Sequence, residues 1–224
     1  MQCLSVTFKL RTPVVMESDY PLHLDGLLAS CVADEAMEFG SDNAWKDAED
    51  LSHLLERTEP DAQGGWVWKA SAFRFKPVSE RFFTSMVRRC EPEAFMHAMD
   101  DGLLEMRRPR TYLDAGSGNE RAYFLLHSYQ WMESATAWCI GDAGEIEQAL
   151  QRVKYLGKMG RNGFGAVDSF SIGPSTEESA WMRRFLPASH DGEPGAQYAS
   201  AHLRLQAPYW KKTGLQHAKS PMQI

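Results

Sequence analysis

The 224-residue sequence has only four cysteines and no CxxC pair. Cys3, Cys31, Cys90 and Cys139 lie far apart in the chain, which argues against a disulfide framework or a structural zinc site and favours a reducing cytoplasm. No apolar run approaches the roughly 18 residues that a membrane span needs. The alternating start MQCLSVTFKLR is not typical of a signal peptide. We therefore expect a cytoplasmic protein with no membrane partner.

Common catalytic and cofactor motifs are also missing. The seven histidines never occur as HxH, HxxxH or HExxH, and there is no GxSxG or GxxxxGK[ST]. We expect no metal site, no cofactor and no catalytic residues. A metal-independent ribonuclease built from scattered side chains stays open, with His23 and His127 as its candidates. Each of these histidines is more typical of a structural residue.

Acidic residues are unevenly distributed. The net charge is −6, yet residues 194–224 contain no Asp or Glu. Acid is concentrated in the segment 41–65, which is expected to form a short polar helix and loop ending at Gly64-Gly65. Such an uneven charge distribution allows one basic face on an acidic protein. A solvated acidic insertion on a neutral domain explains the charges equally well.

Hydrophobic periodicity predicts an α+β fold. Residues 4–10 alternate apolar and polar like a half-buried strand, and 24–32 have helical spacing with Asp25 as a possible N-cap. The segment 66–77 is expected to be a strand stopped by Pro77, whereas 78–119 has no steady period and is interpreted as an excursion from the sheet. Strand-like residues follow at 120–131 and 134–140, which continue into or pair with each other.

A helix over 142–157 and a strand over 164–172 complete the pattern. Asp142 and Glu145 form a capping box, and Gly157 is expected to end the helix. The resulting order, strand-helix-strand-strand-helix-strand, is that of a ferredoxin-like (RRM-like) fold. We expect one such domain over 1–173, with a thumb-like insertion at 78–119 and the acidic insertion at 41–65. Residues 174–224 are expected to pack on this domain as an extended C-terminal segment.

Glycines and basic residues are interleaved in YLGKMGRNGFGAVDSF (155–170). A dinucleotide fingerprint is excluded here, because the helix precedes these glycines instead of following them. A helix end followed by a flexible turn explains Gly157, but not the clustered cations. Glycine lets a backbone approach a ligand closely, and cations with a nearby aromatic ring suit an RNA chain. On the residues alone, RNA contact and a plain turn are equally supported.

Two further basic clusters are candidates for RNA contact. Residues 69–89 carry Arg74, Lys76 and Arg81 among several phenylalanines, a combination found in single-strand binders. Residues 106–112 place Arg107, Arg108 and Arg110 around Pro109 at the end of the expected excursion. A run such as the second cluster is usually a solvated loop, but at the end of the excursion it could form a basic thumb.

Three short motifs and the glycine-rich stretch resemble a known family. The helix with GKMGRNGFGAV resembles the glycine-rich loop of the RAMP superfamily of CRISPR proteins. Within that superfamily, PLHLDGLLA (21–29), MRRFLP (182–187) and APYW (207–210) resemble the fifth-class Cas subunit of type IV effector complexes.

The resemblance implies a non-catalytic subunit of an antiviral ribonucleoprotein complex. Such a subunit binds the 5′ handle of the guide RNA and caps a filament of backbone Cas subunits, while target DNA is recognised through the complex. A large or flanking-motif-reading subunit is the other implied partner. The residues implied to line the handle are Lys154, Lys158, Gly160, Arg161, Asn162, Gly163, Phe164 and Gly165. The thumb arginines would kink the guide or contact the neighbouring backbone subunit.

Two alternatives remain beside this hypothesis. One is a metal-independent endoribonuclease of the same fold that processes CRISPR repeat RNA. The other is a ferredoxin-like small-ligand or interaction domain unrelated to RNA.

Overall fold

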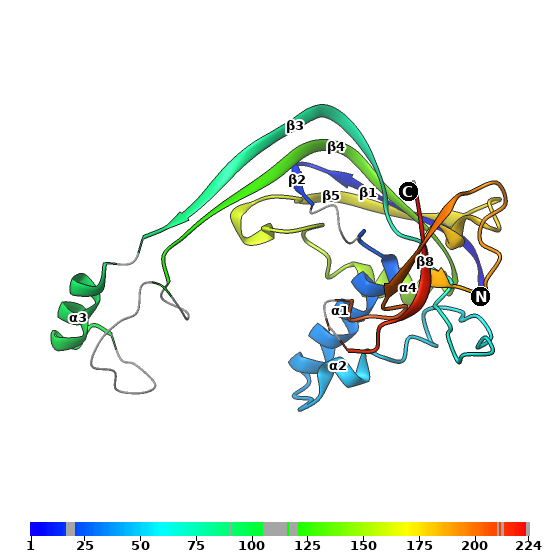
Figure 1. Ribbon diagram of the computed structural model, residues 1–224, viewed down its shortest axis with the longest axis horizontal. Helices are drawn as coiled ribbons and strands as arrows, with labels where there is room; N and C mark the ends of the chain where they lie inside the picture. The colour runs from blue at the N-terminus through cyan, green and yellow to red at the C-terminus, as the bar shows by residue number, and fades with distance from the viewer. Residues whose placement is uncertain are drawn as a thin grey trace. The chain divides into compact units, whose positions relative to one another are not determined.

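The structure is a computed structural model that describes residues 1–16, 21–89, 91–104, 116, 121–209, 211 and 213–222. The chain divides into two compact units, shown within one ribbon in Figure 1. Unit 1 comprises Met1–Glu80 and Gln130–Ile224, and unit 2 comprises Arg81–Tyr129. No helix among the described residues is long and apolar enough to cross a membrane.

The main sheet has five strands in the order β2-β4-β1-β5, with β3 also pairing with β4. Strand β1 is central and runs antiparallel to both β4 and β5. The bounds are β1 Gln2–Leu10, β2 Val14–Val15, β3 Arg74–Arg88, β4 Tyr123–Gly141 and β5 Val167–Pro174.

The alternation predicted for the first strand is confirmed. Leu4, Val6 and Phe8 are each at most 1% exposed, whereas the residues between them are only half-buried. Phe8 lies opposite Phe170 of β5 and Ala135 of β4, so these side chains share the core face.

Three helices of unit 1 cover that core face (Figure 1). They are α1 Leu24–Glu38, α2 Ala44–Asp47 and α4 Ala143–Leu150. The acidic segment 41–65 contributes to the core as well, because Leu51, Leu54 and Leu55 are each 1% exposed. Its charged residues are solvated, but its leucines hold it against the sheet.

The helix caps were predicted with mixed success. Asp142 is the N-cap of α4, and its carboxylate accepts hydrogen bonds from the backbone N–H of Gly144 at 3.0 Å and Glu145 at 3.1 Å. The helix ends at Leu150, however, so the prediction that it continues to Gly157 is wrong. The N-cap of α1 is His23, and Asp25 lies buried in the first turn instead of capping it.

Strand boundaries also differ from the predictions. Residues 66–73 form only isolated bridges, and the regular strand β3 begins at Arg74 and passes through Pro77. Among the described strands β3 pairs only with β4, and such an edge strand tolerates Pro77 because it can leave one N–H position unpaired. Strand β4 joins residues 123–131 and 134–140 of the two predicted segments in one element, and the strand predicted from 164 begins at Val167.

The C-terminal part of unit 1 forms a second, three-stranded antiparallel sheet. Its strands are β6 Leu186–Pro187, β7 Tyr198–Leu203 and β8 Gln216–Pro221, in the order β6-β8-β7. Trp181, Phe185, Leu186, Leu205 and Ala218 form its core together with Val67. Val67 connects this small core to the segment that precedes β3.

Unit 2 contains residues 81–88 of β3, residues 123–129 of β4 and the helix α3 Pro92–Asp100. Within it, the rings of Phe82 and Tyr129 stack at 5.7 Å. No residue of α3 is buried. The expected thumb at 78–119 overlaps this unit, and its role stays a prediction.

Candidate nucleic-acid interface

The glycine-rich loop, residues 157–165, is a braced hairpin rather than a flexible turn. Its two ends pair through an isolated bridge between Tyr155 and Ala166, and the backbone N–H of Leu156 donates to the carbonyl of Gly165 at 2.8 Å. The segment after β1 holds it from the other side. Lys158 N–H donates to the Val15 carbonyl at 2.9 Å, and Gly165 N–H donates to the Pro13 carbonyl at 2.7 Å.

Thr12 anchors the loop with its side chain. Its hydroxyl donates to the carbonyl of Gly163 at 2.7 Å and accepts from the N–H of Ala166 at 2.8 Å. Sequence reasoning missed Thr12, because nothing in the turn after the first strand signals a contact 151 residues away.

Three of the four glycines serve the loop's own packing. A Cβ at Gly165 would lie 1.8 Å from the Leu156 carbonyl oxygen, and one at Gly157 would lie 2.8 Å from that of Val15. A Cβ at Gly160 would lie 2.8 Å from the side chain of Tyr155. Only at Gly163 would an added Cβ meet nothing within 4 Å, so this is the glycine that a ligand can approach.

The loop presents several polar side chains to solvent. Lys154, Lys158, Arg161 and Asn162 are exposed, whereas Phe164 is half-buried and Gly165 is buried. Arg161 and Asn162 belong to a short 3-10 turn, Gly160–Asn162, that the left-handed backbone of Met159 (φ 63°) introduces. The structure therefore brings the basic residues of the loop together on a fixed backbone.

The open face of the sheet offers little for base stacking. Opposite the helices, β1 and β5 present Ser5, Thr7, Lys9, Ser169 and Ser171, as their register requires. Trp138 shares this face, but the guanidinium of Arg183 covers its ring at 4.6 Å. RRM-type recognition depends on exposed aromatic residues at such positions. The loop is the stronger candidate for RNA contact.

The other predicted basic residues do not join the loop. Arg74 and Lys76 lie on β3, which is separated from β5 by β4 and β1. Lys76 forms an exposed ion pair with Glu133 at 2.6 Å. Arg81 belongs to unit 2, and Arg107, Arg108 and Arg110 lie outside the described residues.

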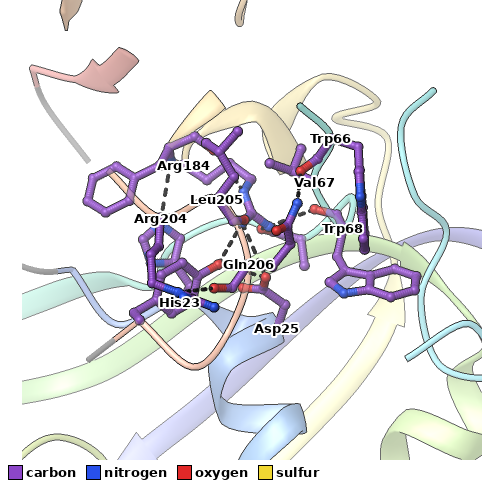
Figure 2. Close-up of polar contacts among 12 residues, drawn as sticks. His23, Asp25, Trp66, Val67, Trp68, Arg184, Arg204, Leu205 and Gln206 are labelled. Atoms are coloured by element: carbon purple, nitrogen blue, oxygen red, sulfur yellow. Dashed lines mark hydrogen bonds and ion pairs between the residues drawn. The ribbon is translucent and has the colours of Figure 1, made fainter. Parts of the chain in front are cut away.

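One buried cluster joins His23 and Asp25 of LHLDGLLA with Arg184 of MRRFLP (Figure 2), and Tyr209 of APYW bonds to it. Arg184 and Asp25 are both 0% exposed and form an ion pair at 3.2 Å. The hydroxyl of Tyr209 donates to the same Asp25 oxygen at 2.7 Å and accepts from Arg184 at 2.7 Å. The guanidinium also donates to the carbonyls of Trp68, Ala70, Phe185 and Leu205. This cluster stabilises the fold and is inaccessible to ligands.

His23 belongs to the same cluster. Its ring stacks on that of Tyr209, with centroids 4.6 Å apart, and packs on that of Phe185, with centroids 4.7 Å apart. His23 is 2% exposed. Burial lowers the pKa of His23 well below its usual range, and the nearby Arg184 charge lowers it further. His127, the other candidate, is half-buried on the part of β4 that belongs to unit 2.

Three cysteines lie in the described part of the chain. Cys3, Cys31 and Cys139 are free thiols, and burial raises the pKa of Cys31 to about 11 and that of Cys139 to about 12. Among the described residues, no group of three or more His, Cys, Asp or Glu side chains is placed to hold a metal ion.

Comparison with known proteins agrees with the resemblance found in the motifs. The family described as "CRISPR type IV associated protein Csf3" matches residues 2–221, which is nearly the whole chain. No curated protein matches it. The expected membership in a type IV CRISPR system is thereby confirmed at the family level. The chain belongs to the Csf3 family, the Cas5-like subunits of type IV CRISPR systems.

Proposed function

We propose that this protein is a non-catalytic, guide-RNA-binding subunit of a type IV CRISPR effector complex. It binds the 5′ handle of the guide, caps the filament of backbone subunits and supports target DNA recognition through the complex. The observation that carries the proposal is the glycine-rich loop, which displays Lys158 and Arg161, next to the exposed Lys154, on a hydrogen-bonded backbone in a Csf3-family chain.

We further propose that unit 1 contains a ferredoxin-like RAMP core. Support comes from the chain order β1-α1-β3-β4-α4-β5 and from the spatial order β5-β1-β4-β3. This is the arrangement expected when two strand-helix-strand halves interlock in one antiparallel sheet. In that arrangement the segment between α4 and β5, which contains the loop, is the connection within the second half.

The loop geometry suits a phosphodiester chain. Arginine, lysine and backbone N–H groups commonly hold phosphate oxygens and fix the register of a bound nucleic acid. Gly163 keeps the surface open beside Arg161 and Asn162, so a backbone can approach closely there. Because the glycines and Thr12 fix the loop conformation, little further conformational entropy is lost when RNA binds.

Burial of His23 favours binding over catalysis. A general acid or base must reach the proton that it transfers, and His23 lies inside the fold. Of the two histidine candidates for the alternative endoribonuclease, this leaves His127. Incubation with repeat RNA in EDTA tests it: we expect no specific cut, and cleavage that His127→Ala abolishes would establish the alternative.

The remaining partners follow from the same proposal. Unit 2, with Arg81 and the thumb arginines, would contact the guide or a neighbouring backbone subunit. A large or flanking-motif-reading subunit would complete the assembly.

The salt dependence of handle binding tests the loop. For single strands, each phosphate contact contributes about 0.7 to the slope of log affinity against log salt. We expect Lys158→Ala combined with Arg161→Ala to weaken binding of a repeat-derived handle RNA and to reduce the slope by about 1.4. Fluorescence anisotropy at several salt concentrations measures both quantities.

A charge-matched control separates contact from overall charge. Lys46→Ala with Arg57→Ala removes two exposed cations from the acidic segment and is expected to leave the slope unchanged. If both double variants reduce the slope equally, or if neither does, the loop is not the RNA site.

A further inference from the structure

A pocket of about 490 Å³ lies beside the glycine-rich loop, where the segment 153–155 meets the start of β5. Its volume is within the roughly 300–1,000 Å³ of small-molecule sites and is sufficient for one nucleotide. The side chains used below are Arg11, Lys154, Tyr155, Asp168 and Phe170, all of which line it.

Two cations line this pocket from different segments. Arg11 follows β1 and Lys154 follows α4, and neither forms an ion pair with a described residue. Their backbones are fixed, because Arg11 N–H donates to the Ala166 carbonyl at 2.8 Å and the Lys154 carbonyl accepts from Val167 N–H at 2.9 Å. Two such cations suit the phosphates on either side of a nucleotide.

Aromatic rings supply apolar surface in the same pocket. Tyr155 is 45% exposed, so part of its ring is available to a ligand. Gly160 positions that ring, since a Cβ there would lie 2.8 Å from the Tyr155 side chain. Phe170 is half-buried and packs beside Phe8 on the neighbouring strand, with ring centroids 5.6 Å apart. A partly exposed ring such as that of Tyr155 can stack on an unpaired base.

Asp168 distinguishes the pocket from a plain phosphate site. The register of β5 shifts here, with Lys9 opposite Ser169 and Leu10 opposite Val167, so Asp168 is the extra residue of a β-bulge. Bulges re-aim side chains at functional sites. A carboxylate repels phosphate, but it accepts hydrogen bonds from an exocyclic amino group such as cytosine N4.

We propose that this pocket receives one unstacked nucleotide of bound RNA, that Tyr155 stacks on its base, and that Asp168 selects bases with an exocyclic amino group. This inference rests on the proposed RNA-binding function and adds a base-selective subsite to it. Arg11 and Lys154 hold the flanking phosphates and contribute no selectivity.

The test compares two pyrimidine octamers, oligo(C) and oligo(U) RNA, binding to the full chain. The two bases have similar shape, but only cytosine carries the amino group. We expect oligo(C) to bind about tenfold more tightly. Asp168→Ala should reduce this ratio to about one without weakening oligo(U). Tyr155→Leu, which keeps an apolar contact with Gly160, should weaken both RNAs roughly tenfold.

Control variants and the loop variant make the outcomes distinct. Asp34→Ala and Lys46→Ala remove exposed charges on α1 and α2 and should leave the ratio unchanged. Melting curves confirm that each variant is folded. An oligo(C)-to-oligo(U) affinity ratio near one in the wild type, or an unchanged ratio in Asp168→Ala, overturns the pocket inference. The proposed function stays intact in that case if RNA binding still depends on Lys158 and Arg161. Absence of any RNA binding overturns both.

Discussion

Arg184 is completely buried, yet all three nitrogen atoms of its guanidinium donate hydrogen bonds. A buried charge is tolerated only when it is paired and hydrogen-bonded, and removing one partner of such a pair typically costs about 3–5 kcal/mol. Asp25 and Tyr209 are therefore essential companions of Arg184. A Cβ at Gly26 would lie 3.1 Å from the Tyr209 ring, so the glycine after Asp25 in the motif LHLDGLLA lets that ring pack closely on α1.

His23 in this cluster predicts a pH dependence of stability. The pKa of its side chain is about 6.5 in the unfolded chain and well below that in the folded protein, since burial and Arg184 disfavour the charged ring. Below about pH 6.5 the unfolded state binds a proton that the folded state does not. The free energy of unfolding should therefore fall with decreasing pH, with a limiting slope of about 1.4 kcal/mol per pH unit.

Urea unfolding of wild type and His23→Gln between pH 7.5 and 5.5 measures this effect. The variant should be less stable at pH 7.5 but should show a shallower pH dependence. His190, whose pKa burial also lowers, contributes in the same direction, so His190→Asn serves as the comparison. Parallel curves for wild type and His23→Gln would contradict the assignment.

At the scale of elements, hydrogen bonds to another segment of the protein fix the shape of the glycine-rich loop. The hydrogen bonds to Val15, Pro13 and Thr12 connect it to the turn after β1, so two segments distant in sequence form one rigid feature. Two of its glycines, Gly157 and Gly165, lie against backbone atoms, Gly160 lies against the Tyr155 side chain, and an added Cβ at Gly163 would meet nothing within 4 Å.

Substitutions at two of the glycines should separate these roles. Gly165→Ala places Cβ 1.8 Å from the Leu156 carbonyl oxygen at a φ of +66°, so we expect a loss of about 3 kcal/mol or more of unfolding free energy. Gly163→Ala meets no atom and should cost only about 1–2 kcal/mol of backbone strain at its φ of +86°. Chemical denaturation of both variants measures the difference, and equal losses would contradict the assigned roles.

Local patterns predicted elements better than boundaries or sites. The alternation of residues 4–10 and the Asp142 cap depend on neighbours within a few residues, and the structure confirms both. The role of Asp25 was mispredicted because its partner, Arg184, is 159 residues away. Pro77 was mispredicted because edge position is a property of the whole sheet. The basic loop could be predicted from composition. The roles of Thr12 and Asp168 could not, because they depend on which segments lie side by side and on the register of β5 against β1.

At the scale of the whole molecule, the two units differ in how much core each one has. The hydrophobic clusters of unit 1 include residues from β1, α1, α4 and the C-terminal sheet, but none of the described residues of 81–129. Unit 2 has exposed apolar side chains such as Phe83, Phe124 and Leu126, at 65%, 66% and 61%. Unit 1 should consequently fold without unit 2.

A variant that replaces residues 81–129 with an Asn-Gly turn tests this expectation. Gln130 Nε2 donates to the Ser79 carbonyl at 2.7 Å and Trp131 N–H donates to the Ser79 hydroxyl at 3.0 Å, so β3 and β4 are already joined at the boundary. A two-residue turn suits such a pair.

We expect one cooperative thermal transition with a midpoint close to that of the full chain, together with retained RNA binding through the loop. Under the proposed function, assembly with backbone subunits should be lost. A broad transition would show instead that unit 2 is needed for folding, and normal assembly would remove unit 2 from the filament contact.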